Sequence, residues 1–476
     1  MRDFIKKAAG VLPSERQLAW QQMEFYAFIH FSVNTFTDRE WGSGEEDPSL
    51  FNPRELDADQ WVGVCKSAGM KGLILTCKHH DGFCLWPSSF TEHTVKNSPW
   101  KDGKGDVVRE AAEACARGGL KFGIYLSPWD RHEKTYGDRD VYNAFFKNQL
   151  RELLTEYGEI FCVWLDGACG EGPNGKRQVY DWDGYYRVVR ELQPGAVISV
   201  CGPDVRWCGN EAGHCRVSEW SVVPADLRDA EKVAEKSQKA DDGEFSKRIH
   251  SSEEDLGSRG VIAGAEELVW YPAEVNTSIR PGWFYHGAED DKVKSVQELV
   301  EIYCKSVGGN ANFLLNIPPD KRGRIHEADV QRLKELGEVL QKAFAENVAA
   351  KARAEASEEM DERHGAQNVL DGNGDTFWCP EEGTEEAELQ VHLGENKAFD
   401  TVVLMEHIGS AGQRVESFVL EIPAEGGWEE IYRGTAIGYK RICRFDEVKA
   451  SSIRFKITQS RWYPTIGYFG VFLSGL

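Results

Sequence analysis

Along roughly the first 340 residues, short apolar runs alternate with longer segments in which apolar residues recur every three or four positions. The short runs are typical of parallel strands covered on both faces, and the longer period is typical of amphipathic helices. We expect strands at 25–32, 72–78, 121–127, 160–166, 196–201, 214–220, 268–275 and 312–319. We expect helices at 57–70, 106–119, 142–158, 182–195, 294–309 and 324–344. This alternation predicts an α/β fold, a (β/α)8-like barrel over residues 1–345.

The pattern changes after residue 345. The segment 346–365 is polar and rich in small residues, and we interpret it as a linker or boundary. Beyond it, short strand-like segments follow one another at spacings of about 8–12 residues with turn residues between them, as in all-β sandwiches. We therefore predict a C-terminal β-sandwich domain over residues 346–476. Within the first domain, the stretch 222–260 is highly charged and poorly periodic, which indicates an insertion or a long loop.

Composition narrows the function classes. The chain has 476 residues, 41% of them hydrophobic, so it can bury a large core. Its formal net charge of −22 repels phosphate backbones, so we expect no nucleic-acid partner. The sequence holds no apolar run long enough for a transmembrane helix, so we expect no membrane insertion. Oligomeric state does not follow from these features.

The cysteine pattern bears on the cellular compartment. Twelve cysteines are spread along the chain, several inside predicted strands, without any Cys-x-x-Cys pair. Buried reduced thiols fit this pattern better than a disulfide framework. The first residues show no signal peptide, so we expect a cytoplasmic protein, or a secreted or periplasmic one if the sequence is a trimmed form.

Candidate chemistry lies where the predicted strands end, because function in a parallel barrel is carried by the loops at the carboxyl ends of the strands. Carboxylates, imidazoles and aromatic rings gathered at one mouth suit a sugar pocket. The candidates are His30, His79 and His80 with Asp81, Tyr125 with Ser127–Asp130, Asp166, Glu211, Glu219 and Glu274.

Asp166 gives the sharpest local signal, because it ends an apolar strand in the sequence VWLDG. A carboxylate there is either a nucleophile or a cap of the following loop. Retaining glycosidases need a second carboxyl group beside the nucleophile. Glu211, Glu219 and Glu274 compete for that role, and the Gly-flanked loop around Glu211 favours it because such a loop can reach across the mouth.

Histidines and aromatic residues near the mouth keep several interpretations. His79 and His80 in KHHDGF suit sugar hydroxyls, a metal site or structural packing. Adjacent residues of an extended strand point to opposite faces, which disfavours a shared metal ion. His30 is either a core residue or a ligand contact, and Glu40 with Trp41 is either a sugar-binding pair or plain surface.

A set of motifs resembles the α-L-fucosidases of glycoside hydrolase family 29. They occur in the expected order over about residues 20–345. The matching segments are HFSVNTFTDREWG, LTCKHHDGFCLWPS, GIYLSPWDRH, VWLDGACG, VRWCGNEAGHCRVSEWSVVP, EVNTSIRPGWFYH and NFLLNIPPDKRGRI. The GNEAG…SEW and SIRPGWFYH segments resemble the branch restricted to α-1,3/1,4-linked fucose of Lewis-type glycans. From LDGNGDTFW onward the chain resembles a discoidin-like (F5/8 type C) domain of the carbohydrate-binding-module type.

This resemblance implies a retaining exo-α-L-fucosidase that acts through a covalent glycosyl-enzyme on fucosylated oligosaccharides or glycoconjugates, without cofactor or metal. It implies that Asp166 is the nucleophile and Glu211 the acid/base, with Glu219 in reserve. Fucose contacts carried over from the family are His30, Glu40, Trp41, His79, His80, Tyr125 and, near the methyl group, Trp283. Contacts to a neighbouring sugar are expected from Trp129, Asp130 and Trp207. The fit departs from the family mainly over 226–262.

Two other functions remain open. One is a catalytically inactive glycan-binding protein, which the predicted sandwich supports. The other is a metal-dependent barrel hydrolase that uses His79, His80 and Asp166. In the sandwich, Trp378, Trp428 and Trp462 are either platforms for a ligand or parts of the core, and core packing is the better interpretation for at least two of them.

Overall fold

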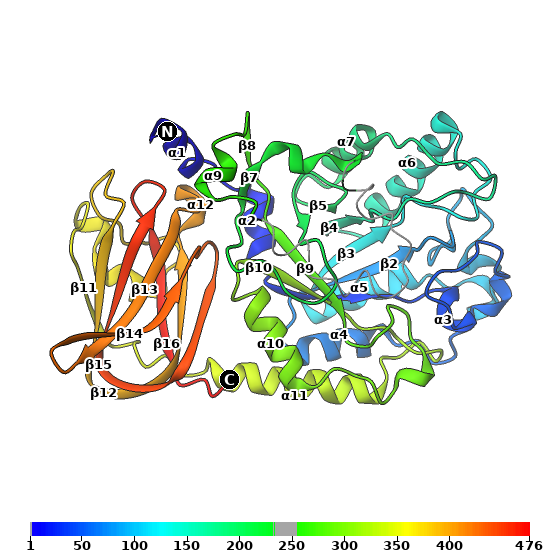
Figure 1. The fold of residues 1–476 in the computed structure, drawn as a ribbon. Helices are drawn as coiled ribbons and strands as arrows, with labels where there is room; N and C mark the ends of the chain where they lie inside the picture. Colours follow the sequence, from blue (N-terminus) through cyan, green and yellow to red (C-terminus); the bar gives the residue numbers. More distant parts are fainter. Residues whose placement is uncertain (1, 232, 234–254) are drawn as a thin grey trace.

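The structure, a computed structural model, describes residues 2–231, 233 and 255–476 and shows two domains side by side (Figure 1). Most of the charged stretch predicted as an insertion therefore lies outside the described residues. The first domain is a nearly closed parallel barrel surrounded by helices, and the second is an antiparallel β domain. Both parts of the predicted fold class are confirmed.

The barrel is one parallel sheet in the order β5-β4-β3-β2-β1-β10-β9-β6. An isolated parallel bridge between Ser199 and Val205 joins its two edges. The strands are β1 (Phe25–Ile29), β2 (Gly72–Lys78), β3 (Lys121–Leu126), β4 (Ile160–Leu165), β5 (Val197–Val200), β6 (Arg206–Trp207), β9 (Ala273–Ser278) and β10 (Ala311–Asn316). A separate two-stranded antiparallel sheet pairs β7 (Val222–Pro224) with β8 (Leu268–Trp270).

The helices begin and end at residues whose side chains favour those positions. Asp57 and Asp106 accept backbone N–H groups at the starts of two helices, and Gly119 ends the second of these with φ +73°. The α-helices of the first domain are α1 (Arg2–Ala9), α2 (Glu15–Gln21), α3 (Val33–Thr37), α4 (Ala58–Ser67), α5 (Val107–Gly118), α6 (Arg139–Glu156), α7 (Trp182–Leu192), α9 (Arg259–Ile262), α10 (Val296–Ser306) and α11 (Glu327–Ala343). Its 3-10 turns are η1 (Pro48–Leu50), η2 (Val95–Asn97), η3 (Trp100–Gly103), η4 (Ala225–Arg228) and η7 (Gly287–Glu289).

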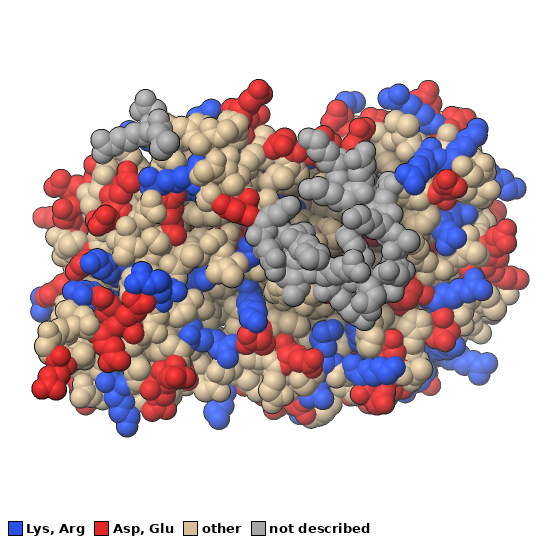
Figure 2. All heavy atoms as spheres, in the orientation of Figure 1, with Lys and Arg blue, Asp and Glu red and all other residues tan. Residues whose placement is uncertain are grey.

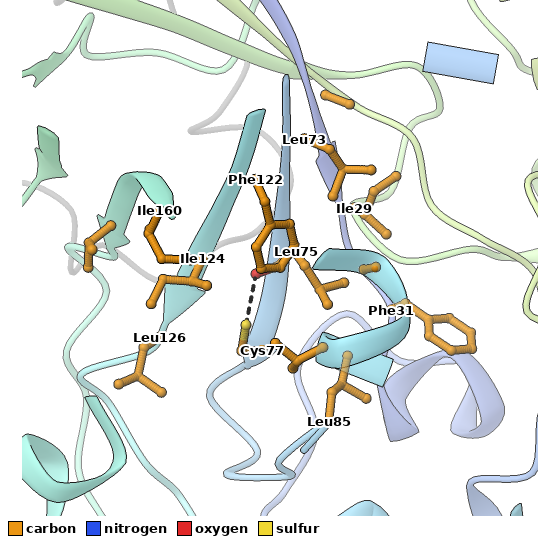
Figure 3. Close-up of a cluster of buried hydrophobic side chains, with 14 of the residues drawn as sticks. Ile29, Phe31, Leu73, Leu75, Cys77, Leu85, Phe122, Ile124, Leu126 and Ile160 are labelled. Carbon is orange, nitrogen blue, oxygen red and sulfur yellow. Dashed lines mark hydrogen bonds between the residues drawn. The ribbon is translucent and has the colours of Figure 1, made fainter. Parts of the chain in front are cut away.

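Alternate residues of each barrel strand face two different cores. Leu73 and Leu75 of β2, with Phe122 and Ile124 of β3, belong to the outer core beneath the helices (Figure 3). The residues between them point inward, where Ile74 packs with Tyr26, Phe28, Tyr125 and Trp164, among others. Because both faces are buried, strands such as β2, β3 and β4 are mostly apolar, which is why the sequence pattern revealed them.

Two expected strands differ from the structure. The segment 214–220 is not a strand, and the sixth position of the barrel is filled instead by β6, which pairs with β9 at Ala273 and Glu274. The run 268–275 is two strands, β8 and β9, interrupted at Tyr271 and Pro272. Proline has no N–H group to donate to a neighbouring strand, so it interrupts the run there.

The second domain is an antiparallel sheet in the order β11-β12-β15-β13-β14, with β16 paired to β12. Its strands are β11 (Arg353–Ala356), β12 (Ala387–Glu406), β13 (Val415–Ala424), β14 (Gly427–Gly434), β15 (Arg441–Ser460) and β16 (Ile466–Phe472). Its short helical elements are η8 (Glu362–His364), η9 (Ala366–Leu370) and α12 (Ile408–Ala411). The segment 346–365 is not only a linker, because β11 lies within it and pairs with β12.

The three tryptophans of this domain have different surroundings. Trp378 is fully buried in the core. Arg454 lies over the ring of Trp428 at 4.4 Å, and Lys6 of the first domain lies over Trp462 at 4.2 Å. Core packing is therefore the structural role of Trp378, whereas the other two rings carry cations.

The surface in Figure 2 intersperses acidic and basic side chains over both domains on the face shown. Within the described part of the chain, no helix combines the length and apolar character that crossing a bilayer requires. All twelve cysteines are free thiols.

Candidate active site

The carboxyl ends of the barrel strands bring most of the predicted site residues together. His30 follows β1, His79 and His80 follow β2, and Asp166 follows β4. The rings of His30 and His79 lie 5.6 Å apart, and those of His79 and His80 lie 4.1 Å apart. The site is therefore a mouth of converging imidazoles beside a carboxylate.

Two donors fix the carboxylate of Asp166. The hydroxyl of Tyr125 donates to its Oδ2 at 2.9 Å, and the N–H group of Ala168 donates to its Oδ1 at 2.9 Å. The side chain is 22% exposed, and His80 Nε2 lies 3.7 Å from Oδ2. Asp166 is thus oriented from inside the barrel while part of it faces the mouth. Tyr125, expected as a fucose contact, lies beneath it and is fully buried.

The tautomer of His80 follows from its partner. Its Nδ1 lies 2.7 Å from Ser127 Oγ, and that hydroxyl donates to the carbonyl oxygen of Trp129 at 2.6 Å. Since the Ser127 proton is committed, His80 Nδ1 carries the hydrogen and donates it. Burial lowers the pKa of His80 to about 4. The ring is therefore neutral near pH 7, with Nε2 as an acceptor.

His30 is fixed in the same way by Asn316, at the end of β10. The Nδ2 group of Asn316 donates to Ser278 Oγ at 2.9 Å and to the carbonyl oxygen of Trp283 at 2.7 Å. Its Oδ1 must therefore accept from His30 Nδ1, which lies 2.8 Å away. Burial lowers the pKa of His30 to about 3, so its Nε2 is a second neutral acceptor.

His79 is packed between aromatic rings. It stacks on Tyr125 at 5.7 Å and meets the edge of Phe284 at 5.0 Å. Burial lowers its pKa well below the ordinary value, and its Nδ1 has no hydrogen-bond partner among the described residues. This ring is the least anchored of the three histidines.

Glu211 reaches the same cluster through Trp283. The indole Nε1 of Trp283 donates to Glu211 Oε2 at 3.1 Å, and the Trp283 ring lies 5.1 Å from the ring of His30. The ring of His30 in turn lies 6.1 Å from that of Tyr125, which holds Asp166. An unbroken run of contacts thus links the two predicted catalytic carboxyl groups.

The other two candidate acids are buried away from solvent. Glu219 has a fully buried side chain that pairs with Arg206 and Arg216. Glu274 lies inside the barrel, where it accepts from Tyr26 at 2.5 Å and from Trp164 at 2.7 Å. Burial raises the pKa of Glu274 to about 7. Both groups are engaged inside the protein, whereas Glu211 is half-buried.

Glu40 and Trp41 lie between α3 and η1, in the segment that connects β1 to α4. Glu40 accepts the N–H groups of Trp283 and Phe284 at 2.8 and 3.0 Å, and His286 Nε2 lies 2.7 Å from its Oε1. Glu40 therefore holds the turn that presents Trp283. Trp41 is 36% exposed and meets the edges of nearby rings at the mouth.

The residues expected to contact a neighbouring sugar fall into two groups. Trp129 lies against Trp41 with ring centres 5.4 Å apart, and the Nε1 of Trp207 donates to Asn276 at 2.8 Å. Asp130 instead is buried, pairs with Lys78 at 2.8 Å and accepts two backbone N–H groups. Both of its oxygens are engaged inside the protein, so the geometry gives no support to a sugar contact by Asp130.

Sequence reasoning included Ser127 among the polar residues at the strand ends, but it did not identify Asn316 and His286 as parts of the site. Asn316 stands at the end of β10, so the rule that located His30 and Asp166 could also have found it. His286 stands in SIRPGWFYH, one of the segments that resemble the family, but its pairing with Glu40 depends on the tertiary fold. Among the described residues, no group of three or more His, Cys, Asp and Glu side chains is placed to hold a metal ion.

Comparisons with known proteins define the family. The family model described as Alpha-L-fucosidase matches residues 11–344, and the F5/8 type C domain matches residues 353–469. The chain belongs to the α-L-fucosidases of glycoside hydrolase family 29, and it is therefore a glycoside hydrolase.

Individual relatives agree with this assignment. The chain is 42% identical to Alpha-L-fucosidase 1 of Arabidopsis thaliana over 97% of this chain and 87% of that protein. The structure of a family 29 member from an unknown rumen bacterium is similar with a TM-score of 0.80 and 41% identity, covering 98% of this chain and 78% of that one. A Ruminococcus gnavus family 29 fucosidase in complex with fucose is similar with a TM-score of 0.84 and 31% identity, covering 97% and 95%.

Proposed function

We propose that this α-L-fucosidase is a retaining exo-enzyme that releases terminal α-1,3- or α-1,4-linked L-fucose from Lewis-type glycans. The retaining mechanism requires two carboxyl groups that reach one glycosidic bond. The observation that carries the proposal is the contact run from Asp166 through Tyr125, His30 and Trp283 to Glu211. The linkage preference is supported by the GNEAG and SIRPGWFYH segments, which supply Glu211 and Trp283 to that run.

In the first step, Asp166 attacks the anomeric carbon and forms a bond to it. The bond from that carbon to the leaving oxygen breaks, and the oxygen takes the proton of Glu211. Tyr125 and Ala168 fix the attacking carboxylate, which reduces the cost of aligning it at the moment of reaction.

In the second step, Glu211 removes a proton from water as the water oxygen attacks the same carbon. The bond to Asp166 breaks, free fucose leaves, and both carboxyl groups regain their starting states. The Nε2 atoms of His30 and His80 accept hydrogen bonds from sugar hydroxyl groups, which hold the ring between the two acids.

Replacement of the nucleophile tests this proposal. Asp166→Ala should lose several kcal/mol of transition-state stabilisation, about a thousandfold or more in rate. Added azide should restore turnover of an aryl fucoside and yield a fucosyl azide, because the small anion fits where the carboxylate was. Near wild-type activity of Asp166→Ala would overturn the assignment.

The acid/base and the linkage need separate measurements. Glu211→Ala should lose activity on an unactivated glycan far more than on an activated aryl fucoside, because only the former needs a proton on its leaving oxygen. A panel of α-1,2-, α-1,3-, α-1,4- and α-1,6-linked fucosides measures the linkage preference. Equal turnover across this panel would contradict the restriction to α-1,3/1,4 linkages.

A further inference from the structure

The loop that carries Glu211 is built on a buried ionic base. The chain leaves β6 at Trp207 and runs through Glu211 to β7. Arg216 connects the two ends of this loop. Its side-chain Nη1 donates to the carbonyl oxygen of Cys208 at 3.1 Å, and its backbone N–H group donates to Glu219 Oε2 at 3.1 Å. Arg206 pairs with the other oxygen of Glu219. Segment 208–221, called the acid loop below, is therefore anchored at both ends inside the protein.

The sandwich domain makes side-chain hydrogen bonds to the acid loop. Gln413, fully buried between α12 and β13, accepts the N–H group of Ser221 at 2.7 Å and donates to the carbonyl oxygen of Glu219 at 3.1 Å. Arg441 Nη1 donates to the carbonyl oxygen of Val217 at 2.9 Å. Thr435 Oγ1 donates to the same carbonyl oxygen of Val217 at 3.2 Å. These bonds join residues about 190 to 220 positions apart, so the second domain contacts this loop at two of its segments.

One barrel residue links the two domains at the same point. Asn310 has φ +68° and donates from Nδ2 to the carbonyl oxygen of Glu219 at 2.9 Å, while its Oδ1 accepts the N–H group of Tyr439 at 2.7 Å. The carbonyl oxygen of Glu219 thus accepts from both domains. Because these groups are buried, removing one partner leaves another polar group unsatisfied.

We propose that the sandwich domain is part of the catalytic unit, with Gln413 and Arg441 as positioning residues that set the acid loop and, through it, the carboxyl group of Glu211. This inference rests on the proposed role of Glu211. Glu211 must meet the leaving oxygen within hydrogen-bond reach, and a displacement of about 1 Å can cost on the order of a hundredfold in rate. The domain then serves the proton-transfer step in addition to any glycan binding.

Gln413→Ala removes both hydrogen bonds of the side-chain amide, and Gln413→Met removes them while keeping the volume of the side chain. The control is Arg444→Ala, which breaks the interdomain ion pair between Arg444 and Glu301, 2.6 Å long and outside the acid loop. For each variant, kcat/KM is measured on dinitrophenyl fucoside, on phenyl fucoside and on a fucosylated glycan. The value of kcat/KM reports the first bond-breaking step. Its dependence on the leaving group therefore measures how well the general acid protonates the leaving oxygen.

We expect kcat/KM of both Gln413 variants to fall about tenfold or more on the phenyl fucoside and the glycan, but less than about threefold on the dinitrophenyl fucoside. Arg444→Ala should change kcat/KM by the same factor on all three substrates. If the Gln413 variants also scale all three substrates equally while Glu211→Ala is selective, the inference is overturned and the proposed function stands. If Glu211→Ala itself shows no selectivity, the proposed role of Glu211 fails first.

Discussion

His286 couples pH to the mouth of the barrel, and its replacement gives a quantitative test of the site. Its Nδ1 lies 2.8 Å from Asp38 and its Nε2 lies 2.7 Å from Glu40. The hydrogen bond to Glu40, more than any other contact, raises the pKa of His286 from 6.5 to about 9. Glu40 also accepts the N–H groups of Trp283 and Phe284, so the charged imidazole stabilises the turn that presents Trp283.

The size of the pKa shift determines how much His286 contributes to the free energy of unfolding. A rise from 6.5 to about 9 corresponds to ~3 kcal/mol of stability. Because the side chains of Asp38 and Glu40 are 63% and 35% exposed, screening by solvent reduces this to about 2 kcal/mol. The folded-state pKa is raised, so the stabilisation is complete below the unfolded value of 6.5 and is lost as pH rises through about 9.

His286→Gln keeps a neutral donor and removes the charge. It should lower the free energy of unfolding by about 2 kcal/mol near pH 6 and by almost nothing near pH 10. Urea unfolding followed by tryptophan fluorescence at the two pH values measures this difference. His392→Gln, which removes a histidine 3.3 Å from Glu355 in the sandwich, is the control for general effects of pH. An equal loss at both pH values, or no loss near pH 6, would refute the electrostatic account.

Three further replacements separate the roles within the site. Tyr125→Phe removes one of the two donors to Asp166 and should lower kcat/KM about tenfold to a hundredfold on activated and natural substrates alike; a selective loss would contradict this. Asn316→Asp places a carboxylate on His30 and opposes the burial that lowers its pKa to about 3, so the pH profile of kcat/KM should gain an acidic ionisation; an unchanged profile contradicts the assigned tautomer. Glu219→Gln leaves two buried arginines without their carboxylate and should cost about 3–5 kcal/mol of stability, visible in thermal denaturation, whereas an unchanged melting temperature would refute the ionic base.

The barrel could be predicted from sequence wherever a strand is long and buried on both faces. The apolar run 72–78 coincides with β2 because every one of its residues is buried. β6 could not be found, since two residues, Arg206 and Trp207, carry no period. The expected strand at 214–220 failed for a related reason, because its buried residues serve the ionic base around Glu219 and not a sheet.

The candidate site likewise has features that local sequence patterns locate and features that only the tertiary fold determines. The positions of His30 and Asp166 follow from the ends of strands, which sequence periodicity locates. The partners that give these groups their chemistry come from distant segments: Asn316 lies 286 positions from His30, and His286 lies 246 positions from Glu40. No local pattern records such pairs, so the sequence indicated which side chains gather at the mouth but not which proton each one carries.

The fixed tautomers limit which groups govern the pH dependence of catalysis. His30 and His80 remain neutral from alkaline pH down to about 4, because burial opposes their charge and Asn316 and Ser127 supply neutral partners. Two neutral Nε2 acceptors can each take a sugar hydroxyl hydrogen without a change of protonation between pH 5 and 8. These two histidines therefore contribute no change of rate in that range, and the proposed mechanism, with one attacking carboxylate and one proton-transferring acid, assigns such changes to carboxyl groups.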